Sequence, residues 1–176
     1  MEEIFDVYTR AGKKIGTAPK STCHGENPGF YHKPVWIWII NSKGEILIQK
    51  RAKTKKHFPS LWDMPSAGHV DSGETCIEGA IRETFEELGV KTIEEDYEYI
   101  GEYIYDLGWE LAQIYFLRLD YEIDKFKIST EEVEEIKWLK YDDFVDIFYS
   151  EKFVPLDKEY KDMICKALKE KLNKLS

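Results

Sequence analysis

The chain has 176 residues, of which 43% are hydrophobic and 14% aromatic, and its formal net charge is −9 at pH 7. This length and composition predict one domain, residues 1–176, with one substantial core, and they exclude a disordered chain. No apolar run approaches the roughly 20 residues of a membrane span. The negative charge argues against nucleic acid, which needs clustered Lys and Arg. We therefore expect a small-molecule partner, with no nucleic acid and no membrane.

The cysteines and the start of the chain bear on its compartment. Cys23, Cys76 and Cys165 are an odd number at no metal-ligand spacing, which predicts free thiols in a reducing environment. The acidic start, Met1-Glu2-Glu3, is not followed by a hydrophobic signal segment. Both features predict a cytoplasmic protein. The oligomeric state is not specified, and a homodimer stays open.

The first third of the chain predicts a strand and a loop before the core begins. Residues Ile4–Tyr8 alternate weakly, as in an edge strand, and Ala11-Gly12-Lys13 follows as a turn. The segment Ser21–Lys33 has loop composition and contains His24 and His32. Two histidines in a loop are more often structural or solvated than metal ligands, because ligation needs partners that the spacing does not reveal.

Two aliphatic runs, Val35–Ile40 and Glu45–Lys50, predict a hairpin in a sheet that is covered on both faces. A polar loop, Ala52–Ser60, follows the hairpin. Basic residues around the start of this loop form an island in an acidic protein: Lys50, Arg51, Lys53, Lys55 and Lys56. Arg51 and Lys55 are candidates for contacts with a diphosphate, and the alternative is that they balance charge at the surface.

The stretch from Gly68 to Val90 predicts a loop that enters a helix over Cys76–Leu88. Thr75 and Glu78 have the spacing of a capping box, and Gly89 supplies a left-handed residue at the end. One side of this helix carries the residues that we expect to pack: Ile77, Ile81, Thr84, Phe85 and Leu88.

The opposite side of the same helix carries three carboxylates, Glu83, Glu86 and Glu87, and Glu74 lies in the loop before it. Carboxylates three and four residues apart repel one another, so this stripe needs a reason. A divalent cation supplies one, and hard oxygen ligands on a rigid helix suit Mg²⁺ or Mn²⁺. The alternative is a solvated acidic face on an amphipathic helix.

The second half of the chain predicts further strands and two final helices. Two long strands are expected over Tyr97–Asp106 and Trp109–Tyr121, and a short one over Ile136–Leu139. The helices are expected over Asp142–Tyr149 and, with an apolar face, over Asp157–Leu172. Together these elements indicate an α/β fold with a mixed sheet between helices.

The stretch Gly68–Val90 resembles the Nudix box at every charged and glycine position; only Thr84 departs from it, where the family usually has an aliphatic residue. The resemblance implies a Nudix-type α/β/α sandwich and a Mg²⁺-dependent hydrolase, in which water attacks the diphosphate linkage of a small nucleoside-diphosphate-type or related substrate. The metal ligands would be Glu83, Glu86 and Glu87, with Glu74 as an additional ligand or an orienting carboxylate. Arg82 would orient a carboxylate through a bidentate pair.

The identity of the general base is left open. Within the box the candidate is Glu83. A loop outside the box offers four alternatives: Glu131, Glu132, Glu134 and Glu135.

Between about Asp6 and Val90 the chain resembles the isopentenyl-diphosphate isomerase branch of the superfamily. The matching residues are Gln49 to Lys56, Pro59, Trp62, Gly68-His69, His24 and His32. The isomerase needs a cysteine just before the Gly-His pair, and Ala67 stands there instead. An isomerase of prenyl diphosphates is thus the second hypothesis. A non-catalytic diphosphate-binding module is the third, and loss of a box glutamate would favour it. The roles of Cys23 and of the histidines stay open.

Overall fold

The computed structural model describes residues 2–174, so Met1 and the last two positions of the predicted 1–176 domain lie outside the described residues. The chain forms two compact units. Unit 1 comprises Met1–Ile37, Ser66–Phe85 and Lys91–Phe116. Unit 2 comprises Trp38–Pro65, Glu86–Val90 and Leu117–Ser176.

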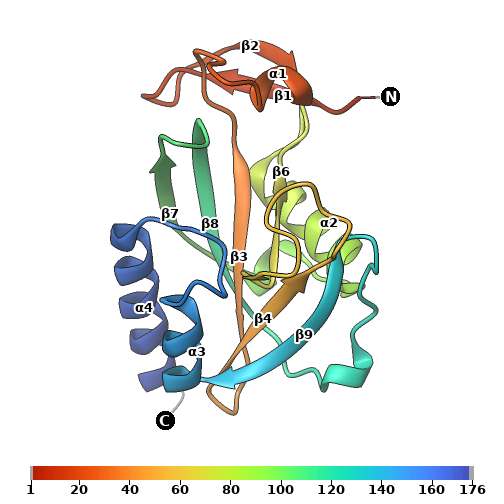
Figure 1. Cartoon of the computed structure of the whole chain (residues 1–176), viewed down its shortest axis with the longest axis vertical. Coiled ribbons are helices and arrows are strands. Elements are labelled where there is room, and N and C mark those ends of the chain that lie inside the picture. The colour runs from red at the N-terminus through yellow and green to blue at the C-terminus, as the bar shows by residue number, and fades with distance from the viewer. Residues whose placement is uncertain (1, 175–176) are drawn as a thin grey trace. The chain divides into compact units, whose positions relative to one another are not determined.

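The elements follow one another in a largely alternating order of strands and helices (Figure 1). The strands are β1 (Ile4–Tyr8), β2 (Lys14–Pro19), β3 (Pro34–Ile40), β4 (Glu45–Arg51), β5 (Trp62–Asp63), β6 (Ser66–His69), β7 (Tyr97–Tyr105), β8 (Glu110–Arg118) and β9 (Val133–Lys140). The helices are α1 (Lys20–Cys23), α2 (Cys76–Leu88), α3 (Tyr141–Phe148) and α4 (Lys158–Asn173), with short 3-10 turns at Glu94–Asp96 and Ile123–Lys125.

The sheet is mixed, as the sequence predicts. Hydrogen-bonded neighbours run in the order β5-β4-β3-β8-β7, with β6 paired to β3 and β9 paired to β4, while β1 and β2 form a separate pair. β3 and β4 are antiparallel. In contrast, His32 forms a parallel bridge with Glu110 at the start of β8, and the Leu119 amide after β8 donates to the Ile40 carbonyl. β3 and β8 therefore run in the same direction.

Helices cover both faces of the sheet within unit 2. Trp38 of β3 packs edge-on against Phe144 and Phe148 of α3, and its indole N–H donates to the Tyr160 hydroxyl of α4 at 2.9 Å. On β4, Gln49 lies on the opposite face, because the antiparallel register places its neighbour Ile48 beside Trp38. The Gln49 amide is 3.5 Å from the Glu87 carboxylate of α2. The predicted α/β/α layering is thus confirmed.

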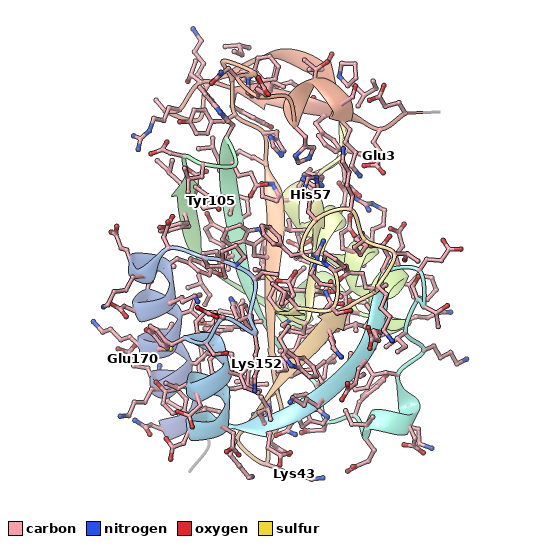
Figure 2. All side chains as sticks on the ribbon, in the orientation of Figure 1. Glu3, Lys43, His57, Tyr105, Lys152 and Glu170 are labelled. Carbon is pink, nitrogen blue, oxygen red and sulfur yellow. The ribbon has the colours of Figure 1, made fainter. Side chains whose placement is uncertain are left out.

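The two C-terminal helices are amphipathic and lie side by side (Figure 1). Tyr160, Ile164 and Leu168 of α4 are fully buried, as their four-residue spacing predicts, whereas Glu170 points away from the ribbon (Figure 2). No helix within residues 2–174 is long and apolar enough to cross a membrane.

Two short elements were not expected from the sequence. β2 has no apolar alternation, and half of its residues are exposed; it forms through antiparallel pairing with β1. α1 occupies part of the segment that the composition predicts to be a loop. Both lie before the core hairpin in unit 1.

Candidate active site

Local signals fix both ends of α2 where the sequence predicts them. The Thr75 amide donates to the Glu78 carboxylate at 2.8 Å, and the Glu78 amide donates back to the Thr75 hydroxyl at 3.3 Å, which completes the capping box. At the other end Gly89 has φ +68°, and a Cβ there would lie 2.6 Å from the Lys127 side chain. Glycine is therefore required twice over at this position, for backbone conformation and for space.

The buried stripe of α2 is centred on Ala80, Thr84 and Leu88, all fully buried. The Thr84 hydroxyl donates to the Ala80 carbonyl at 2.8 Å and accepts from the Tyr97 hydroxyl at 2.9 Å. The unusual threonine of the box thus satisfies its own polar group inside the core. Phe85, which the sequence places on the packing side, is 48% exposed. It lies about 100° around the helix from Thr84, outside the stripe.

Arg82 holds two carboxylates in unit 1. Its Nε and Nη2 donate to the two oxygens of Glu74 at 3.0 and 2.9 Å, a bidentate pair. Its Nη1 donates to Glu83 Oε1 at 2.7 Å, and Nη2 also donates to the His69 carbonyl. The hydrogen bonds to Glu74 and Glu83 raise the pKa of Arg82 above its usual value. The Glu83 carboxylate is thereby tied to β6 and to the loop before α2.

Gly68 makes room for the Glu83 carboxylate. A Cβ on Gly68 would lie 1.8 Å from Glu83 Cδ and 2.1 and 2.2 Å from the two oxygens. The carboxylate therefore lies directly against the backbone of β6, a place that no other amino acid at position 68 leaves open.

The last turn of α2, in unit 2, carries the other two box glutamates. Glu87 is 7% exposed, while Glu86 is exposed. The carbonyls of Glu87 and Leu88 accept from the amides of Ser129 and Lys127, both at 2.9 Å, so the end of the helix is firmly held. A solvated acidic face does not describe α2, because Glu87 is buried and the Glu83 side chain is only 14% exposed.

The basic island is paired with acids in unit 2. Arg51 donates to the buried Asp63 carboxylate at 2.7 Å, and burial raises the pKa of Asp63. Lys55 donates to Glu132, and Lys50 donates to Glu134 at 3.1 Å. Of the candidate diphosphate ligands, Arg51 is thus engaged with Asp63 and Lys55 with Glu132. Two loop candidates for the general base, Glu132 and Glu134, are likewise paired with lysines.

A cluster of three histidines in unit 1 was not expected. His24 follows α1, His32 precedes β3 and His69 ends β6, and one ligand atom of each lies within 4.8 Å of the others. Both ring nitrogens of His32 and Nε2 of His69 are buried without a hydrogen-bond partner among residues 2–174. Burial lowers the pKa of His32 to about 3 and holds the pKa of His69 well below its usual range. Both rings are therefore neutral at pH 7, the form that binds metal ions.

An acid lies beside this histidine cluster. Glu110 Oε1 is 3.8 Å from His32 Nε2, and the Glu110 side chain is 15% exposed. Burial raises the pKa of Glu110 to about 8. These four residues could hold a divalent cation, since imidazole nitrogens and carboxylates are the ligands of Zn²⁺ and Mn²⁺. Their sequence spacing gave no signal, because separate elements bring them together.

The thiol that the isomerase needs before the Gly-His pair is missing. Ala67 pairs with Trp36 between β6 and β3 and carries no reactive group. Cys23 is 1% exposed, packs with Phe5 and Val7, and burial raises its pKa. All three cysteines are free, as predicted.

The chain matches known proteins over most of its length. The NUDIX domain family model matches residues 30–163. Nudix hydrolase 3 of Arabidopsis thaliana is 32% identical over 89% of this chain, but the chain spans only 22% of that protein's length. An uncharacterized Nudix hydrolase of Listeria innocua is 33% identical over 77% of this chain and 80% of its own length. An isopentenyl-diphosphate Delta-isomerase of Corynebacterium efficiens is 31% identical over 78% of this chain and 76% of its own.

A solved structure agrees with the fold. Protein DR0079 of Deinococcus radiodurans superimposes with a TM-score of 0.74, at 20% identity, over 96% of this chain and 98% of its own. The family model covers more than half of the chain, and the Listeria innocua relative, at 33% identity, is matched over 80% of its length. This chain therefore belongs to the Nudix hydrolase family, whose enzymes act on pyrophosphate bonds.

Proposed function

We propose that this protein is a Mg²⁺-dependent hydrolase, with Mn²⁺ as the alternative metal, that cleaves the diphosphate linkage of a small nucleoside-diphosphate-type or related substrate. The main support for this proposal is the position of Glu83, whose carboxylate lies against Gly68 and accepts a hydrogen bond from Arg82. A carboxylate fixed in this way is prepared for a ligand before the ligand arrives, which is what a metal or substrate site needs.

We infer that Glu83, Glu86 and Glu87 hold the metal. They lie three and four residues apart on α2, so they share one stripe of that helix. Glu74 gives both oxygens to Arg82, which favours an orienting role for Glu74 over direct ligation. When bound, the metal would neutralise phosphate charge and lower the pKa of attacking water.

The remaining roles belong to proton transfer and substrate contact. We favour Glu83 as the general base because it lies on the stripe of α2 that would hold the metal, whereas Glu132 and Glu134 are paired with lysines of the basic island. Arg51 and Lys55 would contact the diphosphate through the N–H groups that do not already donate to Asp63 and Glu132.

We also propose that the two units act as one Nudix domain in a cytoplasmic protein whose partner is the small-molecule substrate. A single family match runs without interruption over residues 30–163, and this stretch includes parts of both units.

The histidine cluster supports a second candidate. We propose that His24, His32 and His69, with Glu110, hold a further divalent cation. Within the described residues, both ring nitrogens of His32 and Nε2 of His69 are buried without a hydrogen-bond partner, so these atoms lose little when they bind a metal. Such a centre favours the isomerase hypothesis, and a relative of this chain is named an isopentenyl-diphosphate Delta-isomerase. Ala67 opposes it, since it replaces the thiol that would move a proton, and the Cys23 thiol beside His24 is buried with a raised pKa.

Thermal melting can test the histidine centre with a matched control, because the chain has a fourth histidine, His57, which is exposed. In a Glu86→Gln background, stoichiometric Zn²⁺ or Mn²⁺ should raise the melting temperature, and His69→Gln should remove most of the increase. His57→Gln should keep it. Equal stabilisation of both variants would rule the centre out.

The function itself is tested by incubating ADP-ribose, nucleoside diphosphate sugars and isopentenyl diphosphate with the protein and Mg²⁺, with EDTA as the control. We expect phosphate-ester products from at least one nucleotide substrate, and no dimethylallyl product. Formation of that isomer would favour the second candidate. Saturable binding without any turnover would favour a non-catalytic module.

A further inference from the structure

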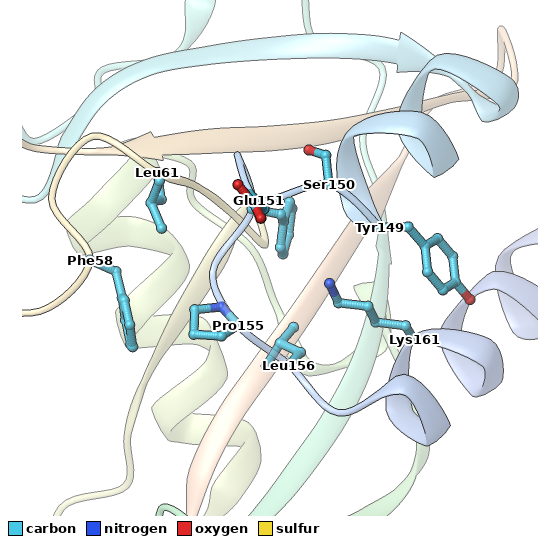
Figure 3. Close-up of a pocket in the computed structure, with 9 residues that line it drawn as sticks. Phe58, Leu61, Tyr149, Ser150, Glu151, Pro155, Leu156 and Lys161 are labelled. Atoms are coloured by element: carbon cyan, nitrogen blue, oxygen red, sulfur yellow. The ribbon is translucent and has the colours of Figure 1, made fainter.

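Unit 2 contains a cavity of about 470 Å³ that the proposed hydrolysis does not use. One wall is the loop that carries Phe58 and Leu61, and the other is the segment from Tyr149 to Leu156 that joins α3 to α4 (Figure 3). Its volume is in the range of small-molecule sites, and most of its lining side chains are apolar or aromatic. The cavity is thus suited to the apolar part of a small ligand.

Lys161, on the first turn of α4, brings a positive charge into this cavity. The residue is only 8% exposed, and Figure 3 shows its amine extending from α4 toward Pro155 and Leu156. Within residues 2–174 the amine has no hydrogen bond or ion pair. It lies 5.4 to 6.0 Å from the ring centres of Phe148, Tyr149 and Phe153, near the outer limit of about 6 Å for cation–π attraction.

The acids near Lys161 do not neutralise it. Asp162 accepts from Lys158 at 2.6 Å and from the Tyr149 hydroxyl at 2.5 Å. Glu151 lines the cavity but is exposed and forms no ion pair with Lys161. The Lys161 side chain is therefore largely buried while its amine has no counter-charge within residues 2–174, and desolvation lowers the pKa of Lys161. Burial of an unpaired charge is costly, so a bound anion would be stabilised here.

We propose that this cavity binds a small monocarboxylate, with its apolar body against Phe58, Leu61 and Leu156 and its carboxylate on the Lys161 amine. The charge of the site selects the class of ligand. It offers a single amine, that of Lys161, and Glu151 lies at its wall, so a diphosphate or another polyanion would be left with uncompensated charge. The lining offers few polar groups to a sugar, which disfavours an uncharged polar ligand.

The loop that forms the other wall of the cavity has an unusual backbone conformation. Phe58 and Ser60 adopt left-handed conformations, with φ of 51° and 59°, which are uncommon for residues with side chains. The Phe58 ring is 47% exposed and stands across the cavity from Lys161 (Figure 3). An apolar ligand would cover this ring, which is otherwise left in water.

Calorimetric titration of the full chain with benzoate and hexanoate, against benzamide and hexanamide, tests the proposal. The amides have nearly the same shape without the charge. We expect saturable binding of at least one carboxylate, at least about tenfold tighter than its amide. Absence of saturation at millimolar carboxylate, or equal affinity for the amide, would overturn the proposal without any variant.

Two variants then locate the charge. Lys161→Met keeps the length of the side chain and should abolish the preference for carboxylate over amide. Lys158→Met, an exposed lysine on the same helix, is the matched control and should keep the preference. If Lys161→Met binds carboxylate as tightly as the wild type, the site is not the one proposed.

Discussion

Gly68→Ala should displace the Glu83 carboxylate and little else. The new Cβ would lie 1.8 Å from Glu83 Cδ, where ordinary contacts begin at 3.4 Å, so the carboxylate must move by about 1.6 Å, the difference between these values. This movement breaks the 2.7 Å hydrogen bond from Arg82. Overpacking of this kind costs roughly 1–3 kcal/mol of stability. A misplacement of about 1 Å in a catalytic group costs about 100-fold in rate.

A double-mutant cycle by urea unfolding isolates the contact between Gly68 and Glu83. Glu83→Ala removes the carboxylate, so Gly68→Ala should cost almost nothing in that background. Glu83→Gln keeps the side-chain volume, and there the cost should persist. If Gly68→Ala lowers the free energy of unfolding equally in both backgrounds, within about 0.5 kcal/mol, Glu83 does not lie against Gly68 and its proposed position is wrong.

Three further predictions concern the metal stripe, the basic island and an exposed ion pair. Glu86→Gln and Glu87→Gln should each lower turnover at saturating Mg²⁺ by at least about 100-fold with unchanged urea midpoints, and wild-type turnover in both would remove the metal assignment. Arg51→Ala should cost roughly 3–5 kcal/mol in urea unfolding, because it leaves the buried Asp63 carboxylate unpaired; a loss below about 1 kcal/mol would contradict the pairing. Hydrogen bonds from Arg10 and Tyr31 lower the pKa of Asp106 to about 2, so the stability that Asp106 contributes is present above its usual pKa and lost as pH falls toward 2. Asp106→Asn should flatten this acid limb, and an unchanged limb would refute the shift.

The parts of the fold that were predicted correctly depend on local chemistry. The capping box and Gly89 lie within a few residues of the ends of α2, so its bounds could be predicted to the residue. Phe85 was placed wrongly because a helix buries only one stripe, and the neighbouring elements decide which apolar residue falls outside it. β2 could not be predicted because its sequence has no periodic pattern. It forms through its pairing with β1.

The sites that could not be predicted depend on contacts between distant segments. His69 reaches the other histidines because β6 pairs with the start of β3, with Pro34 opposite His69. The fit of Glu83 against Gly68 likewise needs the position of β6. Lys161 gave a weak signal, because it lies three residues before Ile164 and seven before Leu168, and thus inside the apolar stripe of α4. A charged residue in such a stripe is more informative than the apolar ones around it.

In the proposed reaction, water attacks a phosphorus atom with the help of the metal that the box glutamates hold. This step is tested most directly by ³¹P NMR of a turned-over nucleotide substrate in H₂¹⁸O with Mg²⁺. We expect one ¹⁸O atom in one of the two phosphate products of each turnover, and no product with EDTA or with Glu86→Gln. Product that carries no ¹⁸O on phosphorus, or turnover that survives both EDTA and Glu86→Gln, would contradict it.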